Sequence, residues 1–255
     1  MKLAVSSLAY MKRPYTEFII LAEKMDFESV ELILDGHHIK ENFGKLGEVI
    51  DSYSLDMSIH APFSDLNIAS LNTRIRSDSL EQIKSAMEVA VDFEADTFTF
   101  HPGRLSPYSV LYEDKAWDMN VESIKYLYSE AMNMDLNICI ENMPEGYGAM
   151  LSSPEDVERL IDSLGDISFT FDIGHACTGE GAIKMIKTMG KNIKNIHIHD
   201  NCGEMDEHLA VGDGKINFRS IFSNLNMYRG NFVIEVHKEE DVLRSKEKIY
   251  KLTGA

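Results

Sequence analysis

The sequence predicts an α/β protein: a single closed barrel of eight parallel strands, each followed by a helical segment. Eight short runs rich in Val, Ile, Phe and Thr alternate with helical patterns from one end of the chain to the other. The length of 255 residues is typical of one (β/α)8 barrel. No Pro/Gly/Ser linker, charge block or low-complexity tract interrupts the sequence, so residues 1–255 are expected to form one domain.

The predicted strands share the β-branched and aromatic composition that strands prefer. They are LAVSSL from Leu3, SVELIL from Ser29, DMSIH from Asp56, TFTFH from Thr97, NICIE from Asn137, SFTFD from Ser168, KNIHIH from Lys194 and FVIEV from Phe232. Strands alternating with helices favour a parallel sheet, and eight repeats favour closure into a barrel. The main alternative, an open doubly wound sheet, is disfavoured because no Gly-rich phosphate loop follows the first strand.

Three of the intervening helices can be placed from the sequence. One extends from about Arg74 to Phe93 and carries apolar residues at helical spacing, namely Leu80, Ile83, Met87, Ala90 and Val91. Another spans about Ala116 to Met134. A third begins at Pro154, with Ser153 as its N-cap and Asp156 in its first turn.

The composition, with 44% hydrophobic and 26% charged residues, is ordinary for a soluble globular protein. The formal net charge of −17 should repel phosphate backbones over most of the surface. A nucleic-acid function would therefore need a local positive site, which bound metal ions could supply.

Targeting and redox signals point to a reducing compartment. Cys139, Cys177 and Cys202 are too few for a disulfide scaffold and predict free thiols. The chain begins Met1-Lys2 and enters an apolar strand without the cleavage pattern of a signal peptide. No stretch of about 18 apolar residues predicts a membrane-spanning helix. We therefore expect a cytoplasmic protein that does not enter a membrane.

Ionisable residues gather at the carboxyl ends of the predicted strands, one strand after another. In a barrel these ends converge on one rim, where the active sites of this fold lie. In chain order the residues are His60 (SIHAPF), His101 (FHPG), Glu141 (CIEN), Asp172 and His175 (FDIGH), His197 and His199 (HIHD), Asp206 and His208 (DEHLAVGDG) and Glu235 (VIEVH).

A lone His at a strand end is more often a hydrogen-bonded structural residue than a metal ligand. Six consecutive strands ending in His, Asp or Glu are hard to explain by core packing, and an unpaired carboxylate in an apolar strand is costly. So many carboxylates and imidazoles on one rim need positive charge nearby, which divalent ions supply. The pattern therefore predicts divalent metal ions such as zinc, manganese or magnesium; no CxxC pair indicates a structural zinc site.

On these motifs the chain resembles the xylose-isomerase-like TIM barrel superfamily, and it comes closest to the endonuclease IV branch (AP endonuclease family 2). The resemblance covers essentially the whole chain, because the order and the spacing of the motifs agree. It implies a cluster of up to three zinc ions held by nine ligands. His60 and His101 would bind one ion; Glu141 would bridge it to a second, also held by Asp172, His197 and Glu235; and His175, Asp206 and His208 would bind the third. The glycine turn that follows the D-x-H pair in the family has a counterpart in Gly212 to Gly214.

The chain also departs from that branch. The loop after strand two, DGHHIKENFG, lacks an obvious Arg or aromatic wedge for entering DNA, although Phe63 stands near the place of a family aromatic that probes the gap at a lost base. The sugar phosphate isomerase and epimerase branch of the superfamily is similar too, notably in DEHLAVGDGKINF and HIHDN. Its members commonly use one metal ion, for which the ligands here would be Glu141, Asp172, His197 and Glu235.

Two enzyme functions remain open, both with Glu141 and Glu235 as catalytic residues. In a phosphodiester or phosphoester hydrolase, acting on a small phosphorylated molecule or on abasic sites in damaged DNA, Glu141 would bridge ions that activate a water. In a sugar or sugar-phosphate isomerase or epimerase, Glu141 and Glu235 would form an acid/base pair. The hydrolase is favoured, because an isomerase does not need His60, His101 or the Asp206/His208 pair as ligands. A metal-binding protein without turnover is the third alternative.

Three further residues are weaker candidates. Arg104 follows the fourth strand and could meet a phosphate, as could Lys215 in the GDGK run. Glu31, near the end of the second strand, could line the pocket or pair with a neighbour. The sequence does not specify the oligomeric state.

Overall fold

The computed structural model describes residues 2–35, 43–50, 52–53, 55–146, 148–179, 181–225 and 227–254, with the backbone alone at 43–45. Most of the DGHHIKENFG loop, residues 36–42, lies outside this part of the chain.

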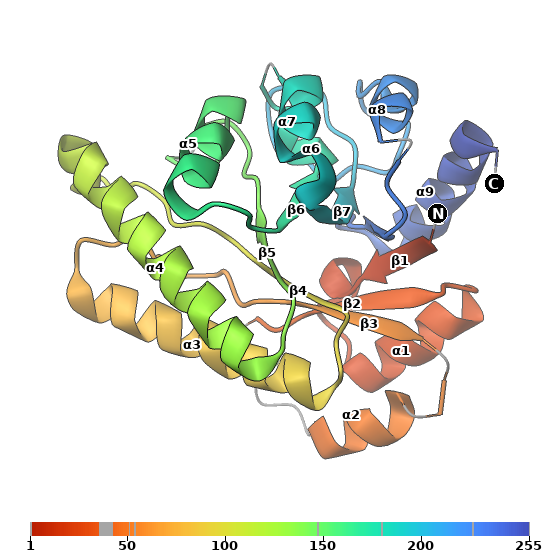
Figure 1. The fold of residues 1–255 in the computed structure, drawn as a ribbon. Coiled ribbons are helices and arrows are strands. Elements are labelled where there is room, and N and C mark those ends of the chain that lie inside the picture. The colour runs from red at the N-terminus through yellow and green to blue at the C-terminus, as the bar shows by residue number, and fades with distance from the viewer. Residues whose placement is uncertain are drawn as a thin grey trace.

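The eight predicted strands are all present and close into a parallel barrel in sequence order (Figure 1). They are β1 (Lys2–Ser6), β2 (Ser29–Ile33), β3 (Asp56–His60), β4 (Thr97–Phe100), β5 (Ile138–Glu141), β6 (Phe169–Asp172), β7 (Ile193–Ile198) and β8 (Asn231–Ile234). The first strand pairs with the last, with Leu3 opposite Phe232 and Val5 opposite Ile234. The prediction of a single (β/α)8 TIM barrel is confirmed, and the open sheet is excluded.

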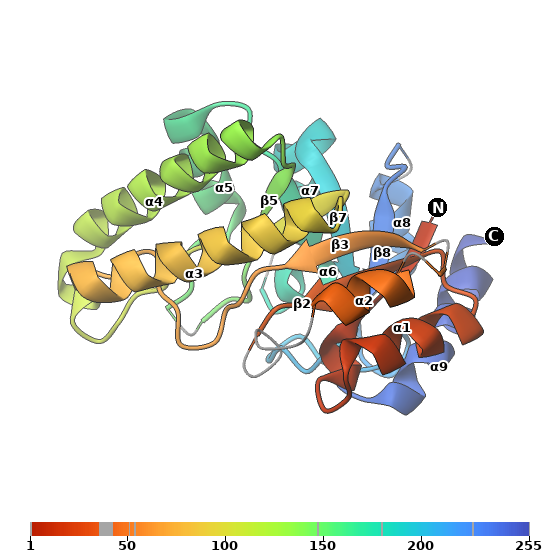
Figure 2. The ribbon, with the colours of Figure 1, turned by 90° about the horizontal axis from the view of Figure 1, so that it is seen from below.

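Helices surround the barrel, with α3 and α4 side by side along one flank and both chain termini close together (Figures 1 and 2). The helices are η1 (Ser7–Tyr10), α1 (Tyr15–Lys24), α2 (Phe43–Ile50), α3 (Thr73–Asp92), η3 (Ser109–Tyr112), α4 (Glu113–Met134), α5 (Pro154–Leu164), α6 (Ile173–Ala176), α7 (Ala182–Met189), η4 (Gly190–Asn192), α8 (Phe218–Asn224) and α9 (Glu239–Thr253). None of those in the described ranges combines the length and the apolarity needed to cross a bilayer.

The predicted element boundaries are close to the observed ones. The start of α5 is as predicted: the Ser153 side chain accepts a hydrogen bond from the backbone N–H of Asp156, and Pro154 is the first helical residue. Helix α3 begins at Thr73, one residue earlier than predicted, directly after its N-cap Asn72. The fourth strand ends before His101 and the eighth before Glu235, so both side chains stand just past the last paired residue.

The apolar core lies between the outer face of the barrel and the helices, as expected for strands covered on both faces. Phe98, Phe100, Phe169 and Phe171 are fully buried there. Cys139 is buried in β5, whereas Cys202 is partly exposed in a loop, and the three cysteines are free thiols, as predicted.

A layer of polar side chains crosses the inside of the barrel just below its carboxyl-terminal rim. Thr99 and Thr170 share a hydrogen bond of 2.7 Å, and the Asn195 amide donates to Thr99 at 3.3 Å and to Glu31 at 2.9 Å. Ser58 donates to the same Glu31 oxygen at 3.2 Å. These groups are all fully buried, so the layer replaces water for the one carboxylate that lies in it.

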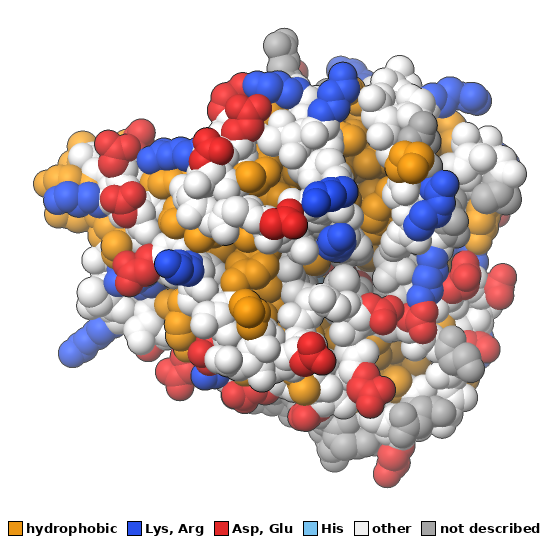
Figure 3. Space-filling model, viewed as in Figure 1, with side chains coloured by type: hydrophobic (Ala, Val, Ile, Leu, Met, Phe, Trp, Pro, Cys, Tyr) orange, Lys and Arg blue, Asp and Glu red, His pale blue; other side chains and the backbone are white. Residues whose placement is uncertain are grey.

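The surface carries both signs of charge. On the face shown in Figure 3, Lys and Arg side chains are interspersed with Asp and Glu, and they form no continuous positive band. The net charge of −17 belongs to the chain as a whole and opposes attraction of a nucleic-acid backbone.

Candidate metal centre

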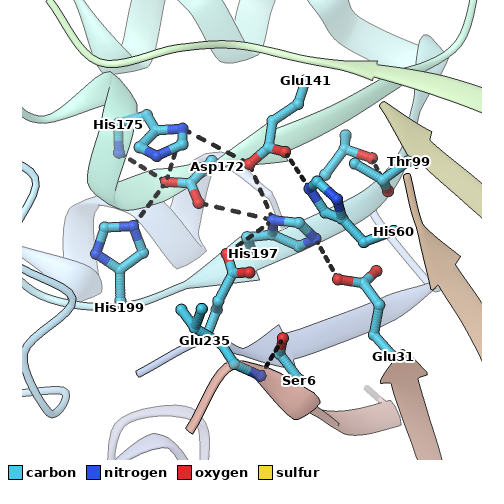
Figure 4. A network of polar contacts seen from close by, with 12 residues as sticks. Ser6, Glu31, His60, Thr99, Glu141, Asp172, His175, His197, His199 and Glu235 are labelled. Carbon is cyan, nitrogen blue, oxygen red and sulfur yellow. Dashed lines mark hydrogen bonds and ion pairs between the residues drawn. The ribbon is translucent and has the colours of Figure 1, made fainter. Parts of the chain in front are cut away.

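The side chains of all nine predicted ligands converge on the carboxyl-terminal end of the barrel, where they form three groups of potential ligand atoms. The first group is His60, His101 and Glu141; the central group is Glu141, Asp172, His197 and Glu235; the third is His175, His199, Asp206 and His208. Glu141 belongs to two of the groups. Figure 4 shows most of this network from close by.

The first group is built on the ends of three neighbouring strands. The Nε2 atoms of His60 and His101 both lie 3.1 Å from Oε2 of Glu141. The Nδ1 atom of His60 contacts the backbone carbonyl of Ala61 at 2.7 Å and donates its proton there. Phe63 packs against the group, with its ring 5.1 Å from that of His101 and 25° from parallel to it.

The central group surrounds one nitrogen of His197. Its Nδ1 atom lies 2.9 Å from Oε1 of Glu141, 3.1 Å from Oε2 of Glu235 and 3.7 Å from Oδ2 of Asp172. All four side chains are buried. Burial alone would lower the pKa of His197, but the carboxylates of Glu31, Glu141 and Glu235 outweigh it and hold that pKa well above its usual value.

The sequence FDIGH places one ligand in each of two groups. Asp172 ends β6 and caps α6, because its Oδ1 atom accepts a 2.6 Å hydrogen bond from the backbone N–H of His175. This single turn carries His175 away from the strand end. Asn142 fixes both residues: its side chain bonds the backbone of Asp172 at 2.9 and 3.0 Å, and its carbonyl accepts from Nδ1 of His175 at 2.8 Å. The sequence did not single out Asn142, although it directly follows Glu141.

The third group is completed by a loop rather than by a strand. Nε2 of His175 and Nε2 of His208 lie 3.2 and 3.1 Å from Oδ2 of Asp206. Nδ1 of His208 donates to the backbone carbonyl of Glu235 at 2.8 Å. His208 has a positive φ of 47°, a conformation that costs a non-glycine residue energy and often occurs at functional sites.

The glycine turn predicted from the GDG run holds this loop in place. The buried Asp200 carboxylate accepts from the backbone N–H groups of Gly212 at 2.8 Å and Ile216 at 3.2 Å. Gly212 has a φ of +95°, and a Cβ on Gly214 would approach the carbonyl oxygen of Asn201 to 2.3 Å. The two glycines therefore let the loop pack closely, and their role is structural.

Charge strongly perturbs the protonation of the third group. Burial would lower the pKa of His175, but Asp172 and Asp206 raise it to about 10. Burial would likewise lower the pKa of His208, but Asp206 and Glu235 raise it to about 9. The pKa of Asp206 lies far below its ordinary value because its hydrogen bonds with these imidazoles outweigh its burial. Without metal, both imidazoles are therefore protonated on both nitrogens and positively charged at neutral pH.

His199 also lies in the third group, although we did not predict it as a ligand. Its Nε2 atom is 3.1 Å from Oδ1 of Asp172 and 3.5 Å from Oδ1 of Asp206. Its ring stacks on that of His208, with the centroids 3.8 Å apart and the planes within 15°. An imidazole binds a metal in its own plane, so two stacked rings cannot both face one ion. The direction of His208 toward Asp206 makes His208 the better ligand.

The donor set fits divalent metal ions. His60, His175 and His208 each direct Nδ1 at a backbone carbonyl, so that Nε2 faces a carboxylate, to which it donates a proton here; loss of that proton would free a lone pair for an ion. Metal-binding histidines usually donate their second ring N–H in this way. Within the described ranges, Oδ2 of Asp172 and Oδ1 of Asp206 are buried without a hydrogen-bond partner. Cations between these atoms would remove that cost, and nitrogen and oxygen donors suit zinc or manganese.

The weaker candidates lie outside the three groups. Arg104 borders a cavity of about 260 Å³ next to His101, which Phe63 also lines. Lys215 lies in the loop that follows the GDG turn. Glu31 lies below the rim with Oε1 at 2.9 Å from Nε2 of His197.

Comparison with known proteins identifies the family. Residues 19–252 match the family described as xylose isomerase-like TIM barrel, so the chain belongs to this superfamily of barrel enzymes. A Methanocaldococcus jannaschii protein, MJ1311, whose function is uncharacterized, is 33% identical over 97% of this chain and 87% of its own length. A Mycobacterium leprae protein named as a probable endonuclease 4 is 25% identical over 79% of this chain and 82% of its own.

The solved structures extend the comparison to sugar-converting enzymes. A protein named D-tagatose 3-epimerase-like superposes with a TM-score of 0.92 at 31% identity, covering 100% of this chain and 97% of that one. A D-psicose 3-epimerase superposes with a TM-score of 0.82 at 16% identity over the full length of both chains, which shows a shared fold. The resemblance to the superfamily is thus confirmed, and relatives of both branches are found.

Proposed function

We propose that this protein is a divalent-metal-dependent phosphoester hydrolase with up to three ions, preferably zinc. One observation supports the proposal: the nine candidate ligand residues lie in three groups, two of which share Glu141. A single-metal isomerase would use only the central group. The first and third groups would then have no function. In these groups His60, His175 and His208 donate from Nδ1 to a backbone carbonyl, as metal-binding histidines usually do.

Glu141, Asp172, His197 and Glu235 would hold the central ion, His60 and His101 the first, and His175, Asp206 and His208 the third. When bound, such ions stabilise charge on phosphate oxygens and lower the pKa of a coordinated water. The carboxylate of Glu141 keeps its two oxygens facing different groups, which fixes the spacing of the first and central sites. Phe63 packs against the imidazoles of both His60 and His101.

The substrate that we propose is a small phosphorylated molecule, with abasic DNA as the alternative. The net charge of −17 opposes tight binding of undamaged duplex. The cavity beside His101 has Arg104 at its edge and is otherwise mostly apolar, so it can accept a compact ester with one phosphate group.

The test is hydrolysis by protein loaded with zinc, manganese or magnesium. Substrates would be bis-p-nitrophenyl phosphate, a set of sugar phosphates, and duplexes with and without one abasic site. Release of alcohol or a nick at the abasic site, abolished by His60→Ala, would support the hydrolase. Protein that carries its metal ions and yet hydrolyses no member of the set would contradict it.

A sugar epimerase is the second candidate, and one contact favours it. Glu141 and Glu235 approach the same nitrogen of His197 at 2.9 and 3.1 Å, so the two residues of the proposed acid/base pair lie at one site. The 31% identical structure named D-tagatose 3-epimerase-like agrees with this function. An epimerase would exchange a carbon-bound proton of a ketose or its phosphate with deuterated water, and Glu235→Gln would abolish the exchange. A hydrolase would show no exchange.

A further inference from the structure

A cavity of about 650 Å³ lies between α7 and α8, at the end of the barrel opposite the candidate metal centre. Its wall includes Ile193 and Lys194 at the start of β7, and Gly230 directly before β8. The candidate metal ligands stand instead at the carboxyl ends of the strands. The volume is in the range of cavities that hold small molecules, and the proposed hydrolysis does not use this cavity.

Positive charge distinguishes the cavity from the chain as a whole. Four of its lining residues are basic, and among the described ones none is Asp or Glu, although acidic residues outnumber basic ones by 42 to 25 in the sequence. The basic residues are Lys187, Lys191, Lys194 and Arg229. In the described part of the chain, Lys191 is the one lysine of the three that reaches a carboxylate, that of Asp166 at 4.0 Å. Over α7 and α8, Figure 3 shows Lys and Arg side chains on both sides of a strip of hydrophobic side chains.

Helix termini account for only part of this charge. α7 and α8 both end beside the cavity, and the carboxyl end of a helix carries about half a negative charge, which nearby lysines stabilise. Lys187 lies in the last turn of α7, and Lys191 lies just beyond it. Lys194 and Arg229 belong to neither helix. The two helix ends offset about one positive charge and Asp166 offsets another, so a net positive charge of about two remains.

The floor of the cavity is apolar and is fixed by hydrogen bonding. Ile186 and Leu225 line it and are almost fully buried. The Tyr228 hydroxyl lies 2.9 Å from the carbonyl oxygen of Lys194 and 3.0 Å from that of Asn231, so it connects the loop before β8 to the start of β7. The cavity therefore combines an ordered apolar surface with cationic side chains, which together recognise an organic anion.

We propose that this cavity is a second binding site, for a small organic phosphate. The apolar or ring-shaped part of the ligand would lie on Ile186 and Leu225. Its phosphate would lie among Lys187, Lys194 and Arg229, whose remaining charge matches that of a phosphate dianion. A nucleic-acid backbone fits less well, because the positive charge is confined to the cavity and does not continue as a band across this face (Figure 3). The site shares no residue with the candidate metal centre, so it is independent of the proposed hydrolysis.

The experiment measures the binding of phenylphosphonate, which has no ester bond to hydrolyse, to the full-length protein by titration calorimetry. Inorganic phosphate supplies the charge without the ring, and phenol supplies the ring without the charge. Lys187→Gln/Lys194→Gln removes two charges from the cavity. The control, Lys24→Gln/Lys125→Gln, removes two charges at exposed positions on α1 and α4. Each titration is run with and without a chelator, and backbone amide NMR locates the bound ligand.

We expect phenylphosphonate to bind more tightly than either fragment, with or without chelator, and to shift the amide resonances of residues 186–194. Its affinity should fall by about fivefold for each lysine replaced, or about 25-fold in Lys187→Gln/Lys194→Gln, because an exposed charge pair at contact distance contributes about that factor. The control variant should bind as wild type does.

Three results would overturn the proposal. The first is no phenylphosphonate binding at millimolar concentration, or equal binding by wild type and Lys187→Gln/Lys194→Gln. The second is a set of shifted resonances confined to the metal-centre rim, with binding lost on addition of chelator. The third is inorganic phosphate or a DNA duplex that binds at the cavity as tightly as phenylphosphonate, since the cavity would then be a charged surface without a place for the apolar group.

Discussion

Removing the shared ligand should have a different result from removing an unshared one. Glu141 directs Oε2 at His60 and His101 and Oε1 at His197. In Glu141→Gln, the carboxylate becomes a neutral amide, whose nitrogen does not bind metal ions and whose oxygen is a weaker ligand than a carboxylate, so the first and the central groups are both weakened. We therefore expect the bound metal to fall from about three ions to about one. Asp206→Asn, which affects the third group alone, should lose about one ion.

The expected loss of metal ions can be converted into a loss of free energy of unfolding. With free zinc at about 1,000 times the dissociation constant, each occupied site stabilises the folded state by about 4 kcal/mol. Loss of two sites then costs about 8 kcal/mol, or roughly 15–30 °C in Tm for a chain of this size. Asp206→Asn should show about half of that decrease.

Elemental analysis and thermal unfolding with and without zinc would measure both quantities. The control is the metal-free form of each variant, because only the zinc-dependent part of Tm reports on the sites. Equal losses of metal in the two variants, or three ions retained in Glu141→Gln, would refute a bridging role for Glu141.

Four further predictions concern the third group and the residues around it. His175→Ala should lower the metal content by about one ion with the fold intact; unchanged content, checked by elemental analysis, would make His175 a substrate contact. Zinc binding at pH 7 should release about two protons from this group, because the pKa values of His175 and His208 are raised to about 10 and about 9; calorimetry in buffers of different ionisation enthalpy would show them as the difference in proton release between wild type and Asp206→Asn. Since those pKa values are raised, their contribution to metal-free stability is complete below about pH 6.5 and is lost as the pH rises through 9 to 10, which a Tm series would show. Gly174→Ala should destabilise the protein by about 1–3 kcal/mol, because its Cβ would come within 1.9 Å of the buried His199 ring; unchanged denaturant unfolding would show that the ring can move.

The barrel and its rim could be predicted because both depend on local patterns. Each strand is a short run of β-branched and aromatic residues, and the topology then brings the residues after each strand to one end. His60, Glu141 and Asp172 are the last residues of their strands, so their convergence follows from the fold alone. Their identity as metal ligands stays a prediction.

The remaining contacts depend on three-dimensional register, which the sequence does not reveal. Glu31 meets His197 across the barrel, 166 residues away in sequence, because the strands are staggered so that one polar layer lies below the rim. Asn142 could not be assigned its part because it acts through the backbone of Asp172 and His175. His199 occupies the same strand end as His197, yet its ring is turned onto His208.

The ligand groups also act as cross-links between distant parts of the chain. Glu141 alone connects to His60 across 81 residues and to His197 across 56. Closing such long loops costs conformational entropy, and this cost grows only slowly with loop length. Closure of the barrel already brings the strand ends together, so the contacts at the rim add little further entropy cost. An ion bound at the rim would thus hold together residues that lie far apart in sequence. We expect its main effect to be slower unfolding, with the folding rate little changed.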